Sequence, residues 1–240
     1  MRLDKYLADA GLGTRHHVKK LIRKGYVKVE EEVIEDEAFN FDPKEKKVYV
    51  EDELVPYEEH FVLLMNKPKG YLCSTIDELY PSVLNLLEPS YRKRAVLVGR
   101  LDVDTTGLFL FTDDGKLANH LINPRFGLEK EYEVTLDHDL KAEDIEDLLK
   151  NGALMDEERV IPKKITVIAS SKAQVVVGEG KYHEIKRLFK SKGYEVTDLK
   201  RLRIGDVTLP SALPLGKYIK CTEEERQHFY ILGKMPEEEE

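Results

Sequence analysis

The chain has 240 residues, 41% of them hydrophobic, which is enough for one sizeable core and a small accessory domain. No apolar run approaches the roughly 18 residues of a membrane-spanning helix, and charges interrupt the apolar residues at the N-terminus, so we expect neither a membrane span nor a signal peptide. Cys73 and Cys221 lie far apart without metal-ligand spacing, which argues against a disulfide or a zinc site and favours a cytoplasmic protein.

The net charge of −8 is unevenly distributed. Residues 1–28 carry eight Lys or Arg against two Asp, whereas residues 29–60 carry thirteen Asp or Glu against three Lys. A second basic stretch, residues 181–203, has eight Lys or Arg against three acidic residues. Screening limits electrostatic attraction to about 8–10 Å, so a nucleic-acid backbone senses local patches rather than total charge. Both basic stretches are therefore candidate nucleic-acid contacts.

Residues 1–58 are predicted to form a small module of two helices and short strands. Leu3 and Leu7 begin a helical stripe, and Thr14 is a suitable N-cap for a second helix that Gly25 ends. Alternating apolar residues then predict short strands over 27–29 and 48–50. Pro56 and the charged residues after it are typical of a linker, which places the domain boundary there.

Residues 59–235 alternate strands and helices, which predicts a mixed α+β catalytic domain. The expected strands cover 61–65, 95–101, 108–112, 129–136, 167–169, 174–177 and 194–209, the last with a break at Gly205. Amphipathic stretches predict a helix after residues 113–115 with Leu117, Leu121 and Ile122 inward, a second over 142–150, and a third from about His183 to Gly193. Residues 236–240 form a short acidic tail.

The segment Gly99–Gly107 is the most informative stretch. Its Asp102 lies on a glycine-flanked loop between two expected strands, where a reacting carboxylate can be held rigidly. Strand alternation would place Arg100 on the same side, where its guanidinium would keep the carboxylate ionised and oriented. By itself, the segment also fits a plain Asx-type turn.

A second reading of this segment is a magnesium-dependent aspartate phosphatase. Asp102-Val-Asp104-Thr-Thr fits the pattern in which the first Asp takes up phosphate and the second acts as a general acid. That reading needs a later acidic pair to bind the metal, but Asp206 has no second carboxylate within the next four residues, and Arg100 interrupts the apolar strand. Activity in EDTA would distinguish the two classes of enzyme.

The N-terminal module resembles an S4 RNA-binding domain. The similarity lies in Arg2-Leu-Asp-Lys-Tyr-Leu, in Thr14-Arg15, and in Leu21-Ile22-x-x-Gly25-x-Val27-x-Val29. It implies RNA contacts from the basic side chains Arg2, Lys5, Arg15, Lys19 and Arg23, the last three along one solvent-facing side of the second helix. One departure is Glu30-Glu31-Glu32 in place of a small turn residue. Because Glu31 is poorly suited to positive φ, we expect a different local turn, with its acidic tip facing away from RNA.

The rest of the chain resembles the pseudouridine synthases. Gly99-Arg-Leu-Asp102-x-x-x-Thr106-Gly107-Leu108 is similar to the active-site motif of that family. Three further matches follow the family's order: Asn66-Lys-Pro-Lys-Gly70, Glu129-Lys-Glu-Tyr132, and residues 179–188. The similarity covers about residues 1–230. The segments around Cys73 and Asp104 are most similar to the small-subunit branch of the family.

This resemblance implies isomerisation of a uridine to pseudouridine in small-subunit (16S) ribosomal RNA, with uridine 516 as the implied target. No cofactor and no metal are implied. Asp102 would start cleavage of the C1′–N1 bond, by attack on the ribose or by removal of its 2′ proton. Tyr132 would stack on the uracil, Ile185 would pack against the base, and Lys186 would pair with Asp102. The uridine must first be flipped out of any stack.

Other residues of these motifs have lesser expected roles. Lys181 and Arg187 would contact RNA, His183 is expected to begin a helix or to hydrogen-bond, and Cys73 is expected to be a buried small residue. Glu184 stands where Gln is usual and Leu188 where Met is common; both lie outside the expected chemistry.

Two other functions fit much of the same pattern. One is a large-subunit pseudouridine synthase of this family, and the other is a non-catalytic ribosome-assembly factor that keeps the fold for RNA binding. The expected partner is ribosomal RNA, free or in an assembling particle. We expect no membrane contact and no obligate protein partner, and hence a monomer.

Overall fold

The computed structural model describes residues 1–56, 60–155, 157–178 and 180–234. The chain divides into two compact units, Met1–His60 with Leu87–Ala95, and Phe61–Leu86 with Val96–Glu240. The expected domain boundary at residues 58 and 59 lies outside the described residues, as do the acidic tail and Glu179 of the third motif.

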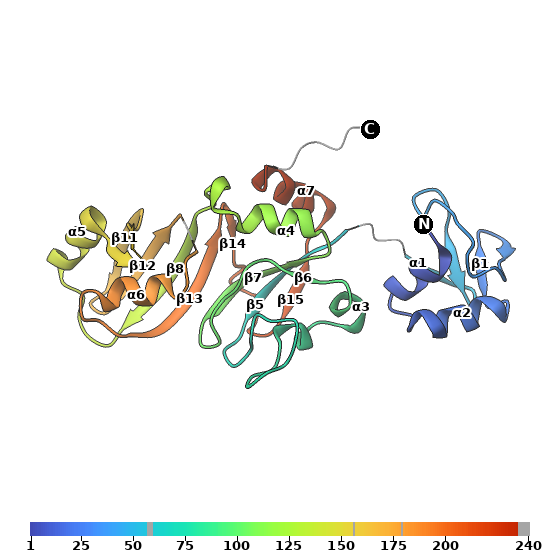
Figure 1. Ribbon diagram of the computed structural model, residues 1–240, viewed down its shortest axis with the longest axis horizontal. Coiled ribbons are helices and arrows are strands. Elements are labelled where there is room, and N and C mark those ends of the chain that lie inside the picture. Colours follow the sequence, from blue (N-terminus) through green and yellow to red (C-terminus); the bar gives the residue numbers. More distant parts are fainter. Residues whose placement is uncertain (57–59, 156, 179, 235–240) are drawn as a thin grey trace. The chain divides into compact units, whose positions relative to one another are not determined.

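The first unit is a helix pair beside a small antiparallel sheet. Thr14 caps the second helix by accepting a hydrogen bond from the backbone N–H of His17, as its position predicts. Leu3, Leu7 and Ile22 are fully buried between the helices and the sheet, so apolar burial holds the module together. The elements are α1 (Leu3–Asp9), α2 (Arg15–Arg23), β1 (Val27–Val29), β2 (Glu32–Val33), β3 (Val48–Val50) and β4 (Glu53–Val55), in the sheet order β2-β1-β3-β4 (Figure 1).

The turn between β1 and β2 differs in detail from the expectation. Glu30, not Glu31, has the left-handed backbone, with φ of 54°. Its carboxylate accepts a hydrogen bond of 2.6 Å from the backbone N–H of Lys47, and its own N–H donates to the Lys47 carbonyl. These two bonds compensate the strain of a side chain at positive φ.

The second unit is built on a mixed sheet of nine strands in the described residues. Its main path is β11-β12-β8-β13-β7-β5-β15, with β14 paired to β13 and β6 to β7. Among the strand pairs that the structure describes, only β13 and β7 are parallel. The strands are β5 (Val62–Lys67), β6 (Val96–Leu97), β7 (Thr106–Thr112), β8 (Lys130–Leu136), β11 (Lys164–Ala169), β12 (Lys172–Val177), β13 (Val196–Ile204), β14 (Val207–Thr208) and β15 (Tyr218–Lys220).

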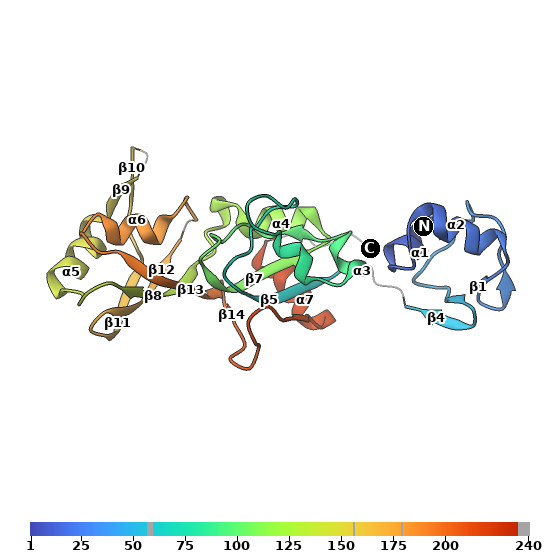
Figure 2. The same ribbon diagram turned by 90° about the horizontal axis from the view of Figure 1, so that it is seen from below.

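Helices cover this sheet in two groups. In Figure 1, α5 and α6 lie against the part that contains β8, β11, β12 and β13, while α4 and α7 lie against the part that contains β5 and β7. A separate hairpin of β9 (Ala153–Met155) and β10 (Glu158–Val160) projects beside α6 (Figure 2). The helices of this unit are α4 (Gly115–Ile122), α5 (Ala142–Asn151), α6 (Glu184–Lys190) and α7 (Glu223–Leu232), with single turns at Val83–Leu86 and Pro124–Phe126, whereas α3 (Pro89–Arg92) belongs to the first unit.

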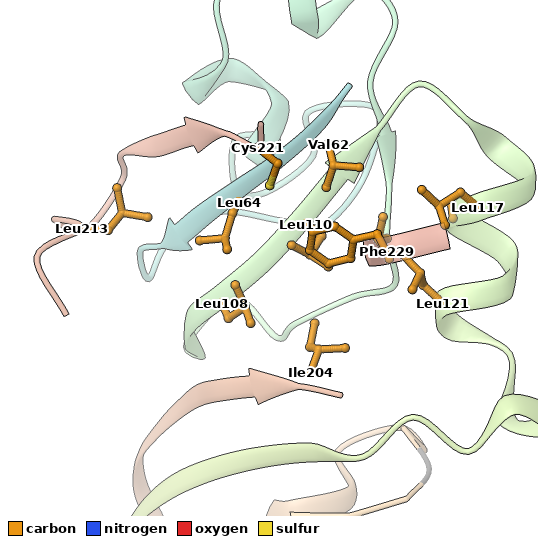
Figure 3. Packing of buried hydrophobic residues seen from close by; sticks show 12 residues of the cluster. Val62, Leu64, Leu108, Leu110, Leu117, Leu121, Ile204, Leu213, Cys221 and Phe229 are labelled. Carbon is orange, nitrogen blue, oxygen red and sulfur yellow. The ribbon is translucent and has the colours of Figure 1, made fainter. Parts of the chain in front are cut away.

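Strand β7 is buried along its whole length because both of its faces are covered. Leu108 and Leu110 point to the face that Leu117 of α4 and Phe229 of α7 cover (Figure 3). Phe109 and Phe111 alternate to the opposite face, where their rings meet edge-on at 5.0 Å. Full burial of each such side chain stabilises the fold by roughly 1.5–3 kcal/mol. The core thus fixes β7, which directly follows the Asp102 loop.

Two sequence expectations are wrong in this region. The strand expected over 95–101 is limited to Val96–Leu97, because Gly99 has a φ of 77° and interrupts the extended backbone. Ile122, expected to face inward with Leu121, is 43% exposed, since it lies at the last position of α4 and at the edge of its buried face. Across the described residues, no helix combines the length and the apolar character that a bilayer span would require.

Candidate active site

The Asp102 loop is tied to the end of β5 by a buried lysine. Lys67 has no exposed surface, and its Nζ donates to the carbonyl oxygens of Pro68, Asp102 and Thr105 at 3.1, 3.0 and 3.1 Å. Burial lowers the pKa of Lys67. The sequence placed Lys67 in a motif but gave it no role. The available signal was a lysine at the end of a wholly apolar strand, a position that requires internal partners.

The Asp102 carboxylate lies between two side chains of the third motif. Lys186 Nζ, which the resemblance pairs with Asp102, is 3.0 Å from its Oδ2, and His183 Nε2 is 3.4 Å from its Oδ1. Lys186 also lies 2.6 Å from Oδ1 of Asp104, so its ammonium bridges two carboxylates. Burial lowers the pKa of Lys186, but its hydrogen bonds to Asp104 and Asp102 outweigh burial and leave that pKa raised. The carboxylate therefore faces a permanent cation.

His183 has a larger part in this arrangement than the sequence indicated. It precedes α6 with a φ of 52°, a left-handed backbone that turns its ring toward Asp102. Its ring stacks on Tyr182, with centroids 3.8 Å apart. The sequence predicted a helix-start residue, which is confirmed, but gave no sign of the approach to Asp102, because that approach depends on the strained backbone.

A cavity of about 500 Å³ opens beside Asp102. All five residues expected to act on the substrate line it: Arg100, Asp102, Tyr132, Ile185 and Lys186. Tyr132 and Ile185 are 9% and 3% exposed, so together they form an apolar wall suited to a planar base. His183 and Arg201 also line the cavity, and neither was given a substrate role from the sequence.

Arg100 does not orient Asp102 as expected. It lies exposed at the cavity and, within the described part of the chain, makes no hydrogen bond or ion pair. The reason is the interruption of the strand at Gly99, which removes the alternation on which the expectation depended. Lys186 and His183 take the place next to the carboxylate instead.

Cys73 and the second basic stretch are partly as expected. Cys73 is largely buried; its Sγ accepts a 3.3 Å hydrogen bond from the Leu101 N–H, and burial raises the pKa of its thiol, so it remains protonated. Lys181 lines the cavity and is paired with Glu158. Arg187 is half-buried rather than outward-facing.

The basic side chains of the S4-like unit surround a hollow lined by Arg2, Lys5, Arg15 and Lys19. The sequence did not show that acidic residues neutralise part of this surface. Glu37 pairs with Lys19 at 3.2 Å and with Arg23 at 2.8 Å.

Three other cations of this surface differ in their pairing. Arg2 pairs with Asp4 at 3.0 Å. Lys5 and Arg15 are exposed and, among the residues that the structure describes, have no ion pair. These two cations are therefore the ones most available to a phosphate.

Comparisons with known proteins agree with this geometry. The family model described as RNA pseudouridylate synthase matches residues 61–191, and the S4 domain model matches residues 1–46. The chain is 39% identical over 236 residues to an RNA pseudouridine synthase of Aquifex aeolicus (strain VF5), covering 98% of each chain. It is 36% identical over 226 residues to ribosomal small subunit pseudouridine synthase A of Escherichia coli (strain K12), covering 94% of this chain and 98% of that one.

A solved structure extends this likeness to the fold. A crystal structure of a pseudouridylate synthase superposes with a TM-score of 0.67 at 33% identity, covering 95% of this chain and 99% of that one. Matching family models, relatives similar over almost the whole length and a carboxylate–lysine pair at a cavity lead to one conclusion: the chain belongs to the RNA pseudouridine synthase family and carries an S4 RNA-binding domain in its N-terminal unit.

Proposed function

We propose that this enzyme isomerises a uridine of small-subunit ribosomal RNA to pseudouridine, with Asp102 as the reacting carboxylate. The observation that carries the proposal is the position of Asp102, held by Lys67, paired with Lys186 and open to a cavity walled by Tyr132. The relative from Escherichia coli named for small-subunit RNA supports that choice of substrate. By the same likeness we propose uridine 516 of the 16S RNA as the target.

The chain's own residues account for the steps. Lys186 pairs with the Asp102 carboxylate and fixes its direction. Asp102 then attacks C1′ or removes the 2′ proton, and the C1′–N1 bond breaks. Tyr132 and Ile185 hold the detached uracil in the cavity while it turns. The C5–C1′ bond then forms as Asp102 leaves C1′ or returns the 2′ proton, C5 loses its proton and N1 gains one, so no atom is gained or lost overall.

We assign RNA attraction to the basic side chains outside the cavity. Arg2, Lys5, Arg15, Lys19 and Arg23 would contact phosphates from the S4 domain, and Lys181 and Arg187 from beside the cavity. Such contacts position the RNA without reading its sequence. They also offset the few kcal/mol required to flip the uridine out of its stack.

The other functions have less support. An aspartate phosphatase needs carboxylates around Asp102 to hold magnesium, but Lys186 and His183 occupy that position. A non-catalytic factor would gain nothing from a lysine that bridges Asp102 and Asp104. A large-subunit synthase would differ from the proposed enzyme only in its RNA substrate.

Tritium release tests the proposal. Small-subunit and large-subunit RNA transcribed with [5-³H]uridine are incubated with the enzyme, because pseudouridine formation frees the C5 hydrogen. We expect release of one equivalent from small-subunit RNA, none from large-subunit RNA, and none from either with Asp102→Asn. Release from large-subunit RNA alone would overturn the proposed substrate, and unchanged release by Asp102→Asn would overturn the mechanism.

A further inference from the structure

The cavity contains a buried cation that the steps above do not use. Arg201 on β13 is 3% exposed and lines the cavity together with Leu199 and Ile204. These three residues occupy the inward positions of the strand, so a charged side chain occupies a position where the pattern calls for an apolar one. Burial of an ionised group is costly unless it is paired.

Arg201 has few partners of its own. The carbon of its guanidinium lies 6.0 Å from the centroid of the Phe109 ring. Its Nε donates a 2.8 Å hydrogen bond to the Leu108 carbonyl. In the described residues, neither terminal nitrogen makes a hydrogen bond or an ion pair, and Nη2 is buried as well as unpartnered. A guanidinium has five N–H donors, so most of its capacity is unused. The positive charge of Arg201 also acts on Lys67 beside the Asp102 loop: burial lowers the pKa of Lys67, and the charge of Arg201 lowers it further.

The position of Arg201 indicates what kind of partner is missing. In the antiparallel pairing of β13 with β8, Arg201 lies directly opposite Tyr132. Directly opposed residues have Cβ atoms about 4.5–5.5 Å apart on the same face of a sheet. The guanidinium is therefore next to the aromatic ring on which we place the uracil. A phosphate is a poor candidate for this buried position, whereas a base carbonyl fits it.

We propose that Arg201 stabilises the negative charge that uracil carries after its bond to ribose is broken. Either route open to Asp102 leaves the C1′–N1 electron pair on the uracil, where the charge spreads over N1 and the carbonyl oxygens. Arg201 donates hydrogen bonds to that charge and gives up no proton. The charge disappears when C5 bonds to C1′, C5 loses its proton and N1 gains one. The inference rests on the proposed function and adds a catalytic residue to it.

A change in leaving-group quality tests this role. Fluorine at C5 withdraws electrons and makes uracil a better leaving group, so its departure depends less on a neighbouring cation. Single-turnover rates are measured on matched RNAs with uridine or 5-fluorouridine at the target, by nuclease digestion and chromatographic separation of the C5-linked nucleoside from its unreacted N1-linked precursor. The ratio of the two rates is independent of the fraction of folded enzyme, since both rates come from one preparation.

We expect Arg201→Gln to slow the uridine reaction on the order of 10²-fold, the usual effect of losing one preorganised donor, and to slow the 5-fluorouridine reaction much less. Lys200→Gln removes the neighbouring cation on the other face of β13 and should leave the ratio unchanged. If Arg201→Gln fails to fold, Arg201→Lys keeps the charge but shortens the side chain, and should shift the ratio in the same direction.

An unchanged ratio in a folded Arg201 variant would overturn the assignment. Failure of the proposed function is recognised separately, in the wild type. If the wild type acts only on large-subunit RNA, the proposed substrate is wrong, and the same ratio is measured on that RNA. If it forms pseudouridine in neither RNA, the proposed function and this assignment are both overturned.

Discussion

Lys186 Nζ lies 3.0 Å from Oδ2 of Asp102, closer to that carboxylate than any other cation that the structure describes. The two residues come from different motifs, one in the loop before β7 and one on α6. Their pairing therefore forms only when the fold brings the loop and α6 together.

Lys186→Met should therefore lower turnover far more than RNA affinity. The ammonium stabilises the ionised carboxylate at the reacting centre, and its loss should reduce kcat on the order of 10²-fold, with Kd for RNA nearly unchanged. Single-turnover kinetics and filter binding measure the two quantities. Lys190→Met, which removes an exposed cation from the same helix, is the matched control. Weaker binding with a normal kcat would contradict the pairing role.

The pair of Asp104 with Lys186 sets a pH range for its contribution to stability. Burial raises the pKa of Asp104, but the hydrogen bond from Lys186 outweighs burial and leaves that pKa below its ordinary 3.8. The pKa of Lys186 is raised above 10.5. Because the pKa of Asp104 is lowered, its carboxylate stabilises the fold above pH 3.8, and this stabilisation is lost as the pH falls through the pKa of the folded state. Because the pKa of Lys186 is raised, its ammonium stabilises the fold below pH 10.5, and that stabilisation is lost as the pH rises through the pKa of the folded state.

Asp104→Asn should accordingly destabilise the protein by the same amount at pH 6 and pH 9, and by less near pH 3. Urea unfolding of both proteins across this range measures the difference. If the stability difference between the two proteins instead grew toward acid pH, folding would raise the pKa of Asp104 rather than lower it.

Gly107→Ala should prevent β7 and β13 from pairing. An added Cβ would lie 2.2 Å from the Arg201 carbonyl oxygen and 2.7 Å from its nitrogen, and the backbone φ is 104°. We expect a loss of more than about 4 kcal/mol of stability, as for other severe backbone clashes, visible as insoluble protein or a collapsed melting transition. Gly127→Ala also introduces a side chain at positive φ, but into open space, and should cost only about 1–2 kcal/mol. Equal losses of stability in Gly107→Ala and Gly127→Ala would show that the clash with Arg201 is not the cause.

Glu37→Gln should strengthen RNA binding. The carboxylate pairs with Lys19 and Arg23, so its removal frees Arg23 for a phosphate and leaves Lys19 with only Asp4, at 3.8 Å. The slope of log K against log salt should steepen by about 0.7 for each new phosphate contact with single-stranded RNA. Arg15→Ala should weaken binding and flatten the slope, because Arg15 is exposed and already available. Filter binding at several salt concentrations measures both. Unchanged binding by Glu37→Gln would show that this side of α2 does not face RNA.

Local patterns predicted most of the fold. The Thr14 cap and the alternation of β8 depend on neighbouring residues, and both are confirmed. The Asp102–Lys186 pair was accessible only through the order of the motifs, since no local rule joins the two.

The residues whose roles were not predicted share one property: a local pattern does not determine where their side chains lie. The partners of Lys67 and Arg201 are distant in sequence, and the positive φ of Gly99 and His183 redirects side chains that regular alternation would place elsewhere. A periodic pattern carries no information on either effect.

The parallel seam between β13 and β7 has a further consequence. β13 also pairs with β8, so the strand after Asp102 and the strand that carries Tyr132 are two strand spacings apart, about 4.8 Å each. Backbone hydrogen bonds thus set the span between the strand that follows Asp102, our proposed reacting group, and the Tyr132 ring that we propose holds the base. Longer loops would leave this span unchanged, whereas one residue inserted in β13 would turn Arg201 to the opposite face and empty the floor of the cavity.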